Sequence, residues 1–447
     1  MTTLVTQLSA VPTARGRLPV LGHSLSILRN PLDFMDSLSE YGDIVRIYLG
    51  PRPAYLVTTV ELIRHISLNE DLWRRDELAE SIKEICLNSV NILTGKEHEL
   101  RRRMIAPAFK QARLAEYAVI TAEIADKWAD GMRDGSDVNL MESIHSLVLE
   151  TVSSTLFTGD FTEHAREQIR IDIPWLLTEV IRRGSLPARV RKSRLVANWR
   201  FARRSARLRA AIRAVVVAYR LQDADRGDVL SALIRHTDKA TGATLSDDEI
   251  IDELILVMAG GVGSQASLLG WILHETMSNP VVAAKVYGEL DEIVGSGPVE
   301  PQHLASLPYL RMVVRESLRM WAPWVSTRTA DGPVTLGDVT LPDGAIVAYS
   351  PYMVHRNDDY YENANVHDPE RWSADRVSSA EKSASLTFGI GPRRCPGNHY
   401  SVLAISLQAA AFFTRWRPVP DANFVVTPSN KDFVLSPSKL PVRLARR

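Results

Sequence analysis

The most reactive side chain that the sequence suggests is Cys395, which lies in a loop rich in glycine, proline and arginine. Arg393 and Arg394 precede it, and a helical pattern runs from Asn398 through Phe413. Backbone amides at a helix N-terminus and neighbouring arginines stabilise a thiolate, so we expect Cys395 to be a ligand or a nucleophile. A nucleophile needs a base and a zinc site needs further ligands, and the local sequence indicates neither.

A single thiolate held by backbone amides suits an axial ligand of heme iron, where it donates electron density and favours O–O cleavage. At this loop the sequence resembles the cytochrome P450 family, because the pattern Phe-x-x-Gly-x-Arg-x-Cys-x-Gly is matched at every position. The resemblance implies that Cys395 is the axial ligand of heme b. It implies that further residues of the loop bind this cofactor, namely Phe388, Gly389, Gly391, Arg393 and Gly397.

An upstream charged pair gains a role from the same resemblance. Glu316 and Arg319 are three residues apart, which by spacing alone indicates a solvated helix-surface pair worth about 0.2–0.5 kcal/mol. The family carries Glu-x-x-Arg here, and Pro369-Glu370-Arg371-Trp372 resembles its segment that supplies a second arginine. The resemblance implies that Glu316, Arg319 and Arg371 form a charge-assisted structural network under the heme.

Heme propionates require cations. His98 and Arg102 lie one helical turn apart, where the family often has Trp or His followed by Arg. The resemblance implies four propionate partners, His98, Arg102, Arg328 and Arg393. An exposed arginine would be the default interpretation of each arginine alone. We assign Arg101, Arg103 and Arg394 to a basic face for an acidic electron donor.

One long helix is predicted from Ser246 to Ser278. Ser246 and Glu249 have the spacing of a capping box, and Asn279-Pro280 ends the pattern. Its centre carries three glycines, each at a cost of about 1 kcal/mol relative to alanine; they are Gly260, Gly261 and Gly263. Close packing explains one or two glycines. Three indicate that a large group lies against the helix or that the helix is kinked or bulged.

The same glycines coincide with a family motif. The run 260–264 aligns with the oxygen-binding motif Ala/Gly-Gly-x-acid-Thr, which implies that Gly260 and Gly261 lie against the cofactor. Gly263 replaces the acid and Ser264 the threonine, so the usual carboxylate for proton delivery is missing. Ser264 either binds oxygen or a water, with Gln265 or the substrate assisting, or donates to its own helix carbonyl. Gly263, Ser264 and Gln265 are the candidate catalytic positions.

Composition excludes several other classes. The 447 residues contain 53 basic and 53 acidic side chains, so no net field attracts nucleic acid. Two cysteines form no disulfide framework, and Cys86 is predicted to be a buried apolar residue. No apolar run of about 18 residues stands near the N-terminus. We expect a cytoplasmic, soluble, monomeric protein without a membrane anchor.

The predicted fold class is mainly α, a single cytochrome P450-type domain over residues 1–447 with a large helical body and a small β-rich region. Residues 1–17 are expected to be a flexible segment. Ile44–Leu49 and Ala54–Thr59 read as strands joined by a turn. Runs within 334–348 read as a three-stranded β-meander.

The predicted function is that of a heme-thiolate monooxygenase that inserts one oxygen atom of dioxygen into a hydrophobic substrate. Other segments of the chain resemble, more weakly than the Cys395 loop does, those of soluble bacterial enzymes that oxidise cyclic terpenes. The implied pocket residues are Leu87, Val90, Ile92, Val257, Val262, Trp324, Val325, Phe433 and Val434, for each of which core packing is the alternative.

Two alternatives to this activity remain open. The missing acid favours a peroxide-dependent or rearranging heme-thiolate enzyme, and a non-catalytic heme sensor or carrier is the other. Because no G-x-G-x-x-G fingerprint is found in a strand-to-helix context, electrons from NAD(P)H are expected through a separate ferredoxin or flavodoxin and its reductase.

Overall fold

The computed structural model describes residues 8–75, 83–158, 163–184, 196–222, 225–429 and 434–447. They form two compact units. Unit 1 comprises Met1–Glu77, Leu318–His367 and Ala374–Cys395, and unit 2 comprises Leu78–Ser317, Asp368–Ser373 and Pro396–Arg447. Helices predominate over strands, so the predicted mainly α class is confirmed. The organisation into one domain over residues 1–447 stays a prediction.

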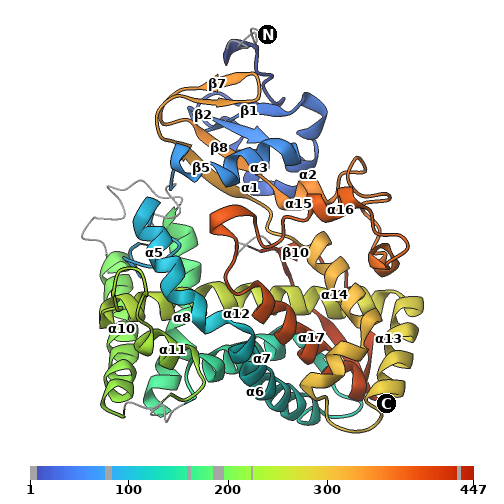
Figure 1. The fold of residues 1–447 in the computed structure, drawn as a ribbon. Helices are drawn as coiled ribbons and strands as arrows, with labels where there is room; N and C mark the ends of the chain where they lie inside the picture. Colours follow the sequence, from blue (N-terminus) through green and yellow to red (C-terminus); the bar gives the residue numbers. More distant parts are fainter. Residues whose placement is uncertain (1–7, 76–82, 159–162, 185–195, 223–224, 430–433) are drawn as a thin grey trace. The chain divides into compact units, whose positions relative to one another are not determined.

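Unit 1 contains the larger sheet, of five strands in the order β1-β2-β8-β5-β3. In chain order its strands are β1 (Ile44–Leu49), β2 (Arg52–Val57), β3 (Trp73–Arg74), β5 (Ser326–Ala330) and β8 (Ile346–Tyr349). Figure 1 shows the consequence, since the early strands β1 and β2, in blue, lie beside the late strands β8 and β5, in orange. Chain segments far apart in sequence therefore build one sheet.

Short helices accompany this sheet. They are α1 (Ser24–Arg29), α2 (Pro31–Asp36), α3 (Val60–Leu68), α15 (Pro351–His355) and α16 (Ser379–Ala384). The core of the sheet buries small and branched side chains such as Val45, Ala54 and Leu56, against which Trp324 and Val325 pack. Unit 1 therefore has an apolar core of its own.

The predicted β-meander is only partly correct. β6 (Val334–Leu336) and β7 (Val339–Leu341) form a two-stranded hairpin, with Gly337 at φ +58° in the turn. β8 instead pairs in parallel with β2 and antiparallel with β5, in the middle of the five-stranded sheet. Val347 and Ala348 are buried, and such a continuous apolar run suits a central strand better than a hairpin edge.

The N-terminal prediction is also revised. Residues 1–7 lie outside the described residues, but Val11 and Ala14 are buried. The Ala14 N–H donates to the Arg46 carbonyl at 3.0 Å, and Ala14 O lies 3.0 Å from Nε2 of buried His23. This part of the 1–17 segment is therefore anchored to β1 rather than free.

Unit 2 contains the long helices. They are α5 (Gly95–Ile105), α6 (Gln111–Asp130), α7 (Leu140–Leu156), α8 (Glu163–Gly184), α10 (Val196–Gln222), α11 (Val229–Arg235), α12 (Asp247–Ser278), α13 (Pro280–Ile293) and α17 (Asn398–Arg415). Its small sheets are β4 (Asp137–Asn139), β12 (Pro441–Arg446) and β9 (Trp416–Pro420) in that order, and β10 (Pro428–Ser429) paired with β11 (Ser436–Pro437). A further helix, α14 (Pro308–Met320), runs from unit 2 into unit 1.

Helix α12 is the central helix of unit 2. It contacts α7, α8, α10, α11, α13 and α17, and Figure 1 shows it lying lengthwise among them. The predicted capping box is present, since the Ser246 side chain accepts from the Glu249 N–H while the Glu249 side chain accepts from the Ser246 N–H. The helix is α-helical from end to end, so the three glycines mark neither a 3₁₀ nor a π segment.

Helix α12 is also the one helix among the described residues that is long and apolar enough to cross a bilayer. Of its most apolar 18-residue window, 61% is buried inside the fold. A buried core helix of a globular protein has the same length and composition.

Candidate functional site

The Cys395 loop is the last segment of unit 1 along the chain, and hydrogen bonds within its own backbone fix its shape. The Cys395 N–H donates to the Phe388 carbonyl at 2.8 Å, and the Arg394 N–H donates to the Gly391 carbonyl at 3.1 Å. Between them Gly391–Arg393 form a single 3₁₀ turn. The thiol is partly exposed, so a rigid loop presents it rather than burying it.

Gly391 is required by a close approach to helix α3. Its φ is +72°, and a Cβ built there would lie 2.5 Å from the Ser67 carbonyl oxygen. Gly389 has a similar φ of +68°, but the nearest atom to its Cβ position is 4.0 Å away. The glycine at 391 is therefore fixed by both conformation and contact, and that at 389 by conformation alone.

Two predicted propionate partners lie near each other in unit 1. Arg393 pairs with Glu70 of a 3₁₀ turn (Glu70–Leu72), and Arg328 of β5 donates to the Thr327 carbonyl at 2.7 Å. Burial lowers the pKa of Arg393 from its usual value, the charge of Arg328 lowers it further, and Glu70 acts in the opposite direction. Two partly desolvated guanidinium groups that repel each other favour an anionic ligand.

The other two predicted partners share helix α5 of unit 2. His98 is 3% exposed, and Arg102, one turn later, is partly exposed. Both belong to the same helix face, as their spacing predicts.

The assignment of Arg101 to a basic outer face is wrong. Its side chain is only 6% exposed and pairs with Glu249 and Glu253 of α12. Burial of an arginine requires such partners, and they lie far along the sequence. Arg103 is half-exposed and bonds Asp238 at 3.0 Å, and Arg394 is exposed, so only these two stay accessible.

The glycines of α12 divide into two kinds. A Cβ at Gly261 would contact Gln265 at 3.6 Å and Val152 of α7 at 3.7 Å, which is ordinary close packing. A Cβ at Gly260 or Gly263 would meet no atom within 4 Å. Although most of the helix is buried, the chain leaves this central face open, as a large group lying against it would require.

The side chains that follow the glycines differ in their contacts. The Ser264 hydroxyl donates to the Gly260 carbonyl at 2.6 Å, which is the back-bonded alternative considered from the sequence. Gln265 is 1% exposed, and its Oε1 has no hydrogen-bond partner in the described part of the chain. A buried acceptor of this kind is suited to an internal water.

The residues present fit heme b. A rigid loop presents one thiol, two neighbouring arginines favour carboxylates, and an open glycine face gives room for a flat apolar group. The predicted cofactor-binding residues within unit 1 are Cys395, Phe388, Gly389, Gly391, Arg393 and Arg328, and those within unit 2 are His98, Arg102, Gly260, Gly261 and Gly397.

The Glu316 carboxylate is completely buried in unit 2. It accepts from the Arg371 Nε at 3.4 Å, the Trp372 indole N–H at 2.9 Å and the Asp368 N–H at 3.1 Å. Arg371 is 2% exposed, so this is not the solvated pair that spacing alone indicates. Trp372 is a member that sequence reasoning missed, although it stands in the motif that supplied Arg371.

Arg319, the third predicted member of the network, donates to backbone carbonyls within unit 1. Its side chain is 2% exposed and donates to the carbonyls of His355, Ala364 (2.8 Å) and Val366 (3.3 Å). Three carbonyl oxygens thus accept from one guanidinium, which has five N–H donors. Arg319 therefore binds the peptide backbone at the end of α15 and in the segment after it.

The predicted pocket residues differ widely in how exposed their side chains are. Leu87 is 59% exposed, and Val257 is partly exposed on the open side of α12. Val90, Ile92, Val262 and Val434 are buried, and Phe433 lies outside the described residues. Trp324 and Val325 pack against the core of unit 1, which supports the core interpretation for those two. Cys86 is fully buried and its thiol pKa is raised by burial to about 12, as expected of a core residue.

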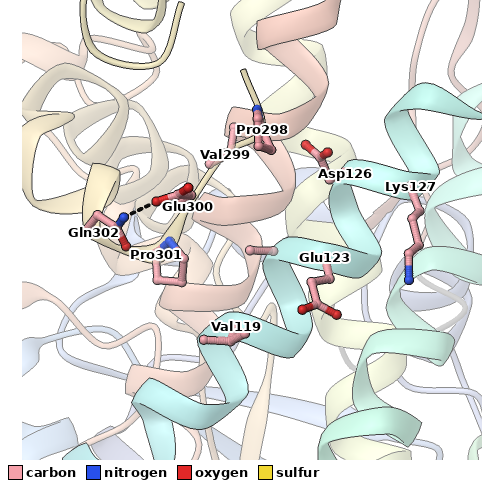
Figure 2. A pocket seen from close by; sticks show the side chains of 10 residues that line it. Val119, Glu123, Asp126, Lys127, Pro298, Val299, Glu300, Pro301 and Gln302 are labelled. Carbon is pink, nitrogen blue, oxygen red and sulfur yellow. Dashed lines mark hydrogen bonds between the residues drawn. The ribbon is translucent and has the colours of Figure 1, made fainter. Parts of the chain in front are cut away.

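A groove in unit 2 lies away from these residues. Figure 2 shows it between α6 and the segment Pro298–Gln302, lined by Glu123, Asp126, Lys127 and Glu300 among others. None of the predicted site residues lines it. We therefore do not assign the reaction to this groove.

Known proteins resemble this chain along nearly its entire length. The sequence model of the family described as Cytochrome P450 matches residues 12–443. Pentalenene oxygenase of Streptomyces avermitilis is 31% identical over 437 residues, which cover 97% of each chain. Cyclooctat-9-en-7-ol 5-monooxygenase of Streptomyces melanosporofaciens is 32% identical over 412 residues, covering 91% of this chain and 90% of the relative. The crystal structure of the cytochrome P450DA heme domain shares the fold, with a TM-score of 0.87 at 18% identity over 99% of this chain and 98% of that one.

Replacing Gly391 by alanine is expected to lower the free energy of unfolding by about 2–4 kcal/mol and to reduce heme retention, because strain and the Ser67 carbonyl act together. Gly389→Ala is the matched control, with strain alone and a loss of about 1–2 kcal/mol. Urea titration and the heme-to-protein absorbance ratio measure both. Equal losses would contradict the role of the α3 contact.

Replacing Glu316 by alanine is expected to lower the free energy of unfolding by about 3–5 kcal/mol, because it breaks a buried charged pair. The control is Lys285→Ala, which removes the half-exposed pair Lys285–Glu370 and should cost at most about 1 kcal/mol. Denaturant midpoints of the two variants give the comparison. A Glu316 variant as stable as the Lys285 variant would show that the buried network contributes little.

Proposed function

The chain belongs to the cytochrome P450 family, and we propose that it hydroxylates a cyclic terpene in secondary metabolism. It is a cytochrome P450 monooxygenase, an oxidoreductase with heme b as cofactor that inserts one oxygen atom of dioxygen into a hydrophobic substrate, with electrons from NAD(P)H through redox partners. The observation that carries the choice of substrate class is the near full-length similarity to two relatives named for terpene oxidation.

The proposed roles of the heme-binding residues follow the pattern of the family. Heme b, when bound, supplies the reductive activation of dioxygen. Cys395 would supply the thiolate that binds the heme iron, and the hydrogen bond from its N–H to the Phe388 carbonyl holds the backbone of the loop in place. Arg328, Arg393, His98 and Arg102 would hold the propionates. Glu316, Arg319 and Arg371 act as structural anchors and take no part in the chemistry.

Proton handling falls to Ser264 and Gln265 in this proposal. Gly263 carries no carboxylate. The polar groups that remain on the open stretch of α12 are the Ser264 hydroxyl and the Gly260 carbonyl to which this hydroxyl donates. While it donates, the Ser264 oxygen keeps acceptor capacity for a water. The unsatisfied Oε1 of Gln265 can hold a second water within the helix packing.

We also propose how the enzyme receives its electrons and in which state it works. A separate ferredoxin or flavodoxin with its reductase would deliver the electrons, and the exposed charges of Arg103 and Arg394 suit an acidic surface. We propose a cytoplasmic monomer without a membrane anchor and without a nucleic acid partner. The mostly buried state of α12 supports its role as a core helix.

A peroxide-dependent or rearranging heme-thiolate enzyme is the second candidate, and Gly263 favours it because the usual acid is absent. A heme sensor or carrier without catalysis is a third. Turnover with ferredoxin, reductase and NAD(P)H is compared with turnover in hydrogen peroxide. Activity with peroxide alone would replace our proposal by the second candidate.

The decisive test of the substrate class is product analysis. The purified enzyme, with its redox partners and NAD(P)H, is incubated with a panel of cyclic sesquiterpenes and diterpenes, and products are identified by mass spectrometry. We expect hydroxylated products from at least one of them and none from Cys395→Ala. Binding without any oxidised product across the panel would contradict the proposed function.

Replacing Ser264 by alanine is expected to divert electrons from product to hydrogen peroxide, with product formation falling on the order of 10²-fold. Ser267→Ala is the control, because the Ser267 hydroxyl makes the same type of bond, to the Gly263 carbonyl at 2.8 Å, from a buried position. Product and peroxide are measured per NAD(P)H consumed. Unchanged coupling in the Ser264 variant would mean that its hydroxyl only bonds its own helix.

A further inference from the structure

Two carboxylates near the start of α12 are buried where most neighbouring helix positions are apolar. Asp252 is 0% exposed and Glu253 is 1% exposed. Burying a carboxylate is costly unless charged groups and N–H donors surround it, so their partners show what the pair does. All of these partners lie in unit 2.

Asp252 holds the backbone at Asn88. One carboxylate oxygen, Oδ2, accepts the Asn88 N–H at 2.8 Å, and the other, Oδ1, pairs with Arg209 of α10. The Arg209 guanidinium also donates to the Ile85 carbonyl at 3.3 Å. One ion pair thus binds the chain at two places.

Glu253 holds the next part of the same segment. Its Oε1 accepts the Val90 N–H at 2.7 Å and a donor of Arg101 from α5 at 3.1 Å. Arg101 donates in turn to the Asn88 carbonyl. Backbone groups at residues 85, 88 and 90 are therefore bound by buried or partly buried charges from three helices, α5, α10 and α12.

We call Asp252, Glu253, Arg101 and Arg209 the clamp, because they bind backbone groups within the segment 85–93. This segment includes the predicted pocket residues Leu87, Val90 and Ile92. The clamp is also aligned with the open face of α12. Glu253, Val257, Gly260 and Ser264 follow one another by four, three and four residues, so they share one side of the helix. The rise over these eleven residues is roughly 16 Å.

Glu253 also differs from an ordinary structural carboxylate. Its Oε2 has no hydrogen-bond partner among the described residues. Burial raises the pKa of Glu253 to about 7 although Arg101 and the Val90 N–H lower it. The other charged or titratable groups around it are Asp252 and Glu249 on α12, Arg209 on α10 and the Cys86 thiol.

We propose that Asp252 and Glu253 are positioning residues that hold the segment 85–93 over the open face of α12 and thereby set the affinity for the substrate. The proposal rests on the proposed function, because that function makes this segment a wall of the pocket. Ionised Glu253 binds the Val90 N–H and Arg101 more strongly than its neutral form does. The clamp is therefore tighter above pH 7 than below it.

The test uses the heme-loaded enzyme and two measurements. Hydrogen–deuterium exchange with mass spectrometry follows the peptide that contains residues 85–93, and steady-state kinetics use whichever terpene the product panel identifies. Glu253→Gln keeps the size and the acceptor and removes the charge, and Asp252→Asn does the same at the other position. Asp247→Asn is the matched control, since it lies on the same helix and its partner Arg220 does not touch the segment.

For Glu253→Gln and Asp252→Asn we expect exchange in this peptide to be about tenfold faster and KM to be about tenfold higher, with kcat changed less than about twofold. Asp247→Asn should match the wild type. In the wild type, KM should fall between pH 6 and pH 8, and this change should be lost in Glu253→Gln. A merely stabilising role would not give that pH dependence.

Wild-type exchange and KM in both variants would overturn the proposal. If a variant folds poorly, the proposal is tested on the wild-type enzyme alone. Its protection from hydrogen–deuterium exchange in this peptide, relative to peptides of α6, should increase from pH 6 to pH 8. Equal protection at both pH values would then refute it. If no terpene is oxidised, the proposed function fails while the exchange data still judge the clamp.

Discussion

The loop that carries Cys395 depends on a distance between two backbones. Gly391 lies so close to the Ser67 carbonyl of α3 that no side chain fits, and this contact fixes where the following 3₁₀ turn begins. The turn then sets the direction of the Cys395 N–H toward Phe388 and the place of Arg393 beside Glu70. Cys395, the proposed iron ligand, and Arg393, a proposed propionate partner, are therefore positioned by main-chain packing, which thermal motion of side chains disturbs little.

Buried charge is the second organising feature, and two residues of α14 use it in the same way. Glu316 collects the donors of Arg371, Trp372 and Asp368 in unit 2, whereas Arg319 donates to carbonyls of unit 1. In each case a charged side chain satisfies the backbone or ring groups of an irregular segment. Segments without regular secondary structure have no ladder of their own, so such side chains replace it.

Local signals in the sequence predicted the parts of the fold that local physics decides. The capping box at Ser246 and the Asn279-Pro280 stop gave both ends of α12, and the Cys395 pattern identified the heme family. Contacts between residues that are far apart in the sequence could not be predicted in this way. β8 joins β2 across about 290 residues, and Arg101 in a run of arginines is buried because Glu249 and Glu253 meet it from α12. No periodicity within either segment contains that information.

Position 263 has a consequence for how this enzyme could change. A Cβ added there meets nothing within 4 Å, and any replacement except proline would improve helix propensity by up to about 1 kcal/mol. Glycine codons differ from those of aspartate and glutamate at one base when the third base matches. The fold thus leaves a single-mutation route from Gly263 to an acidic side chain. The packing around Gly263 would not oppose such a mutation.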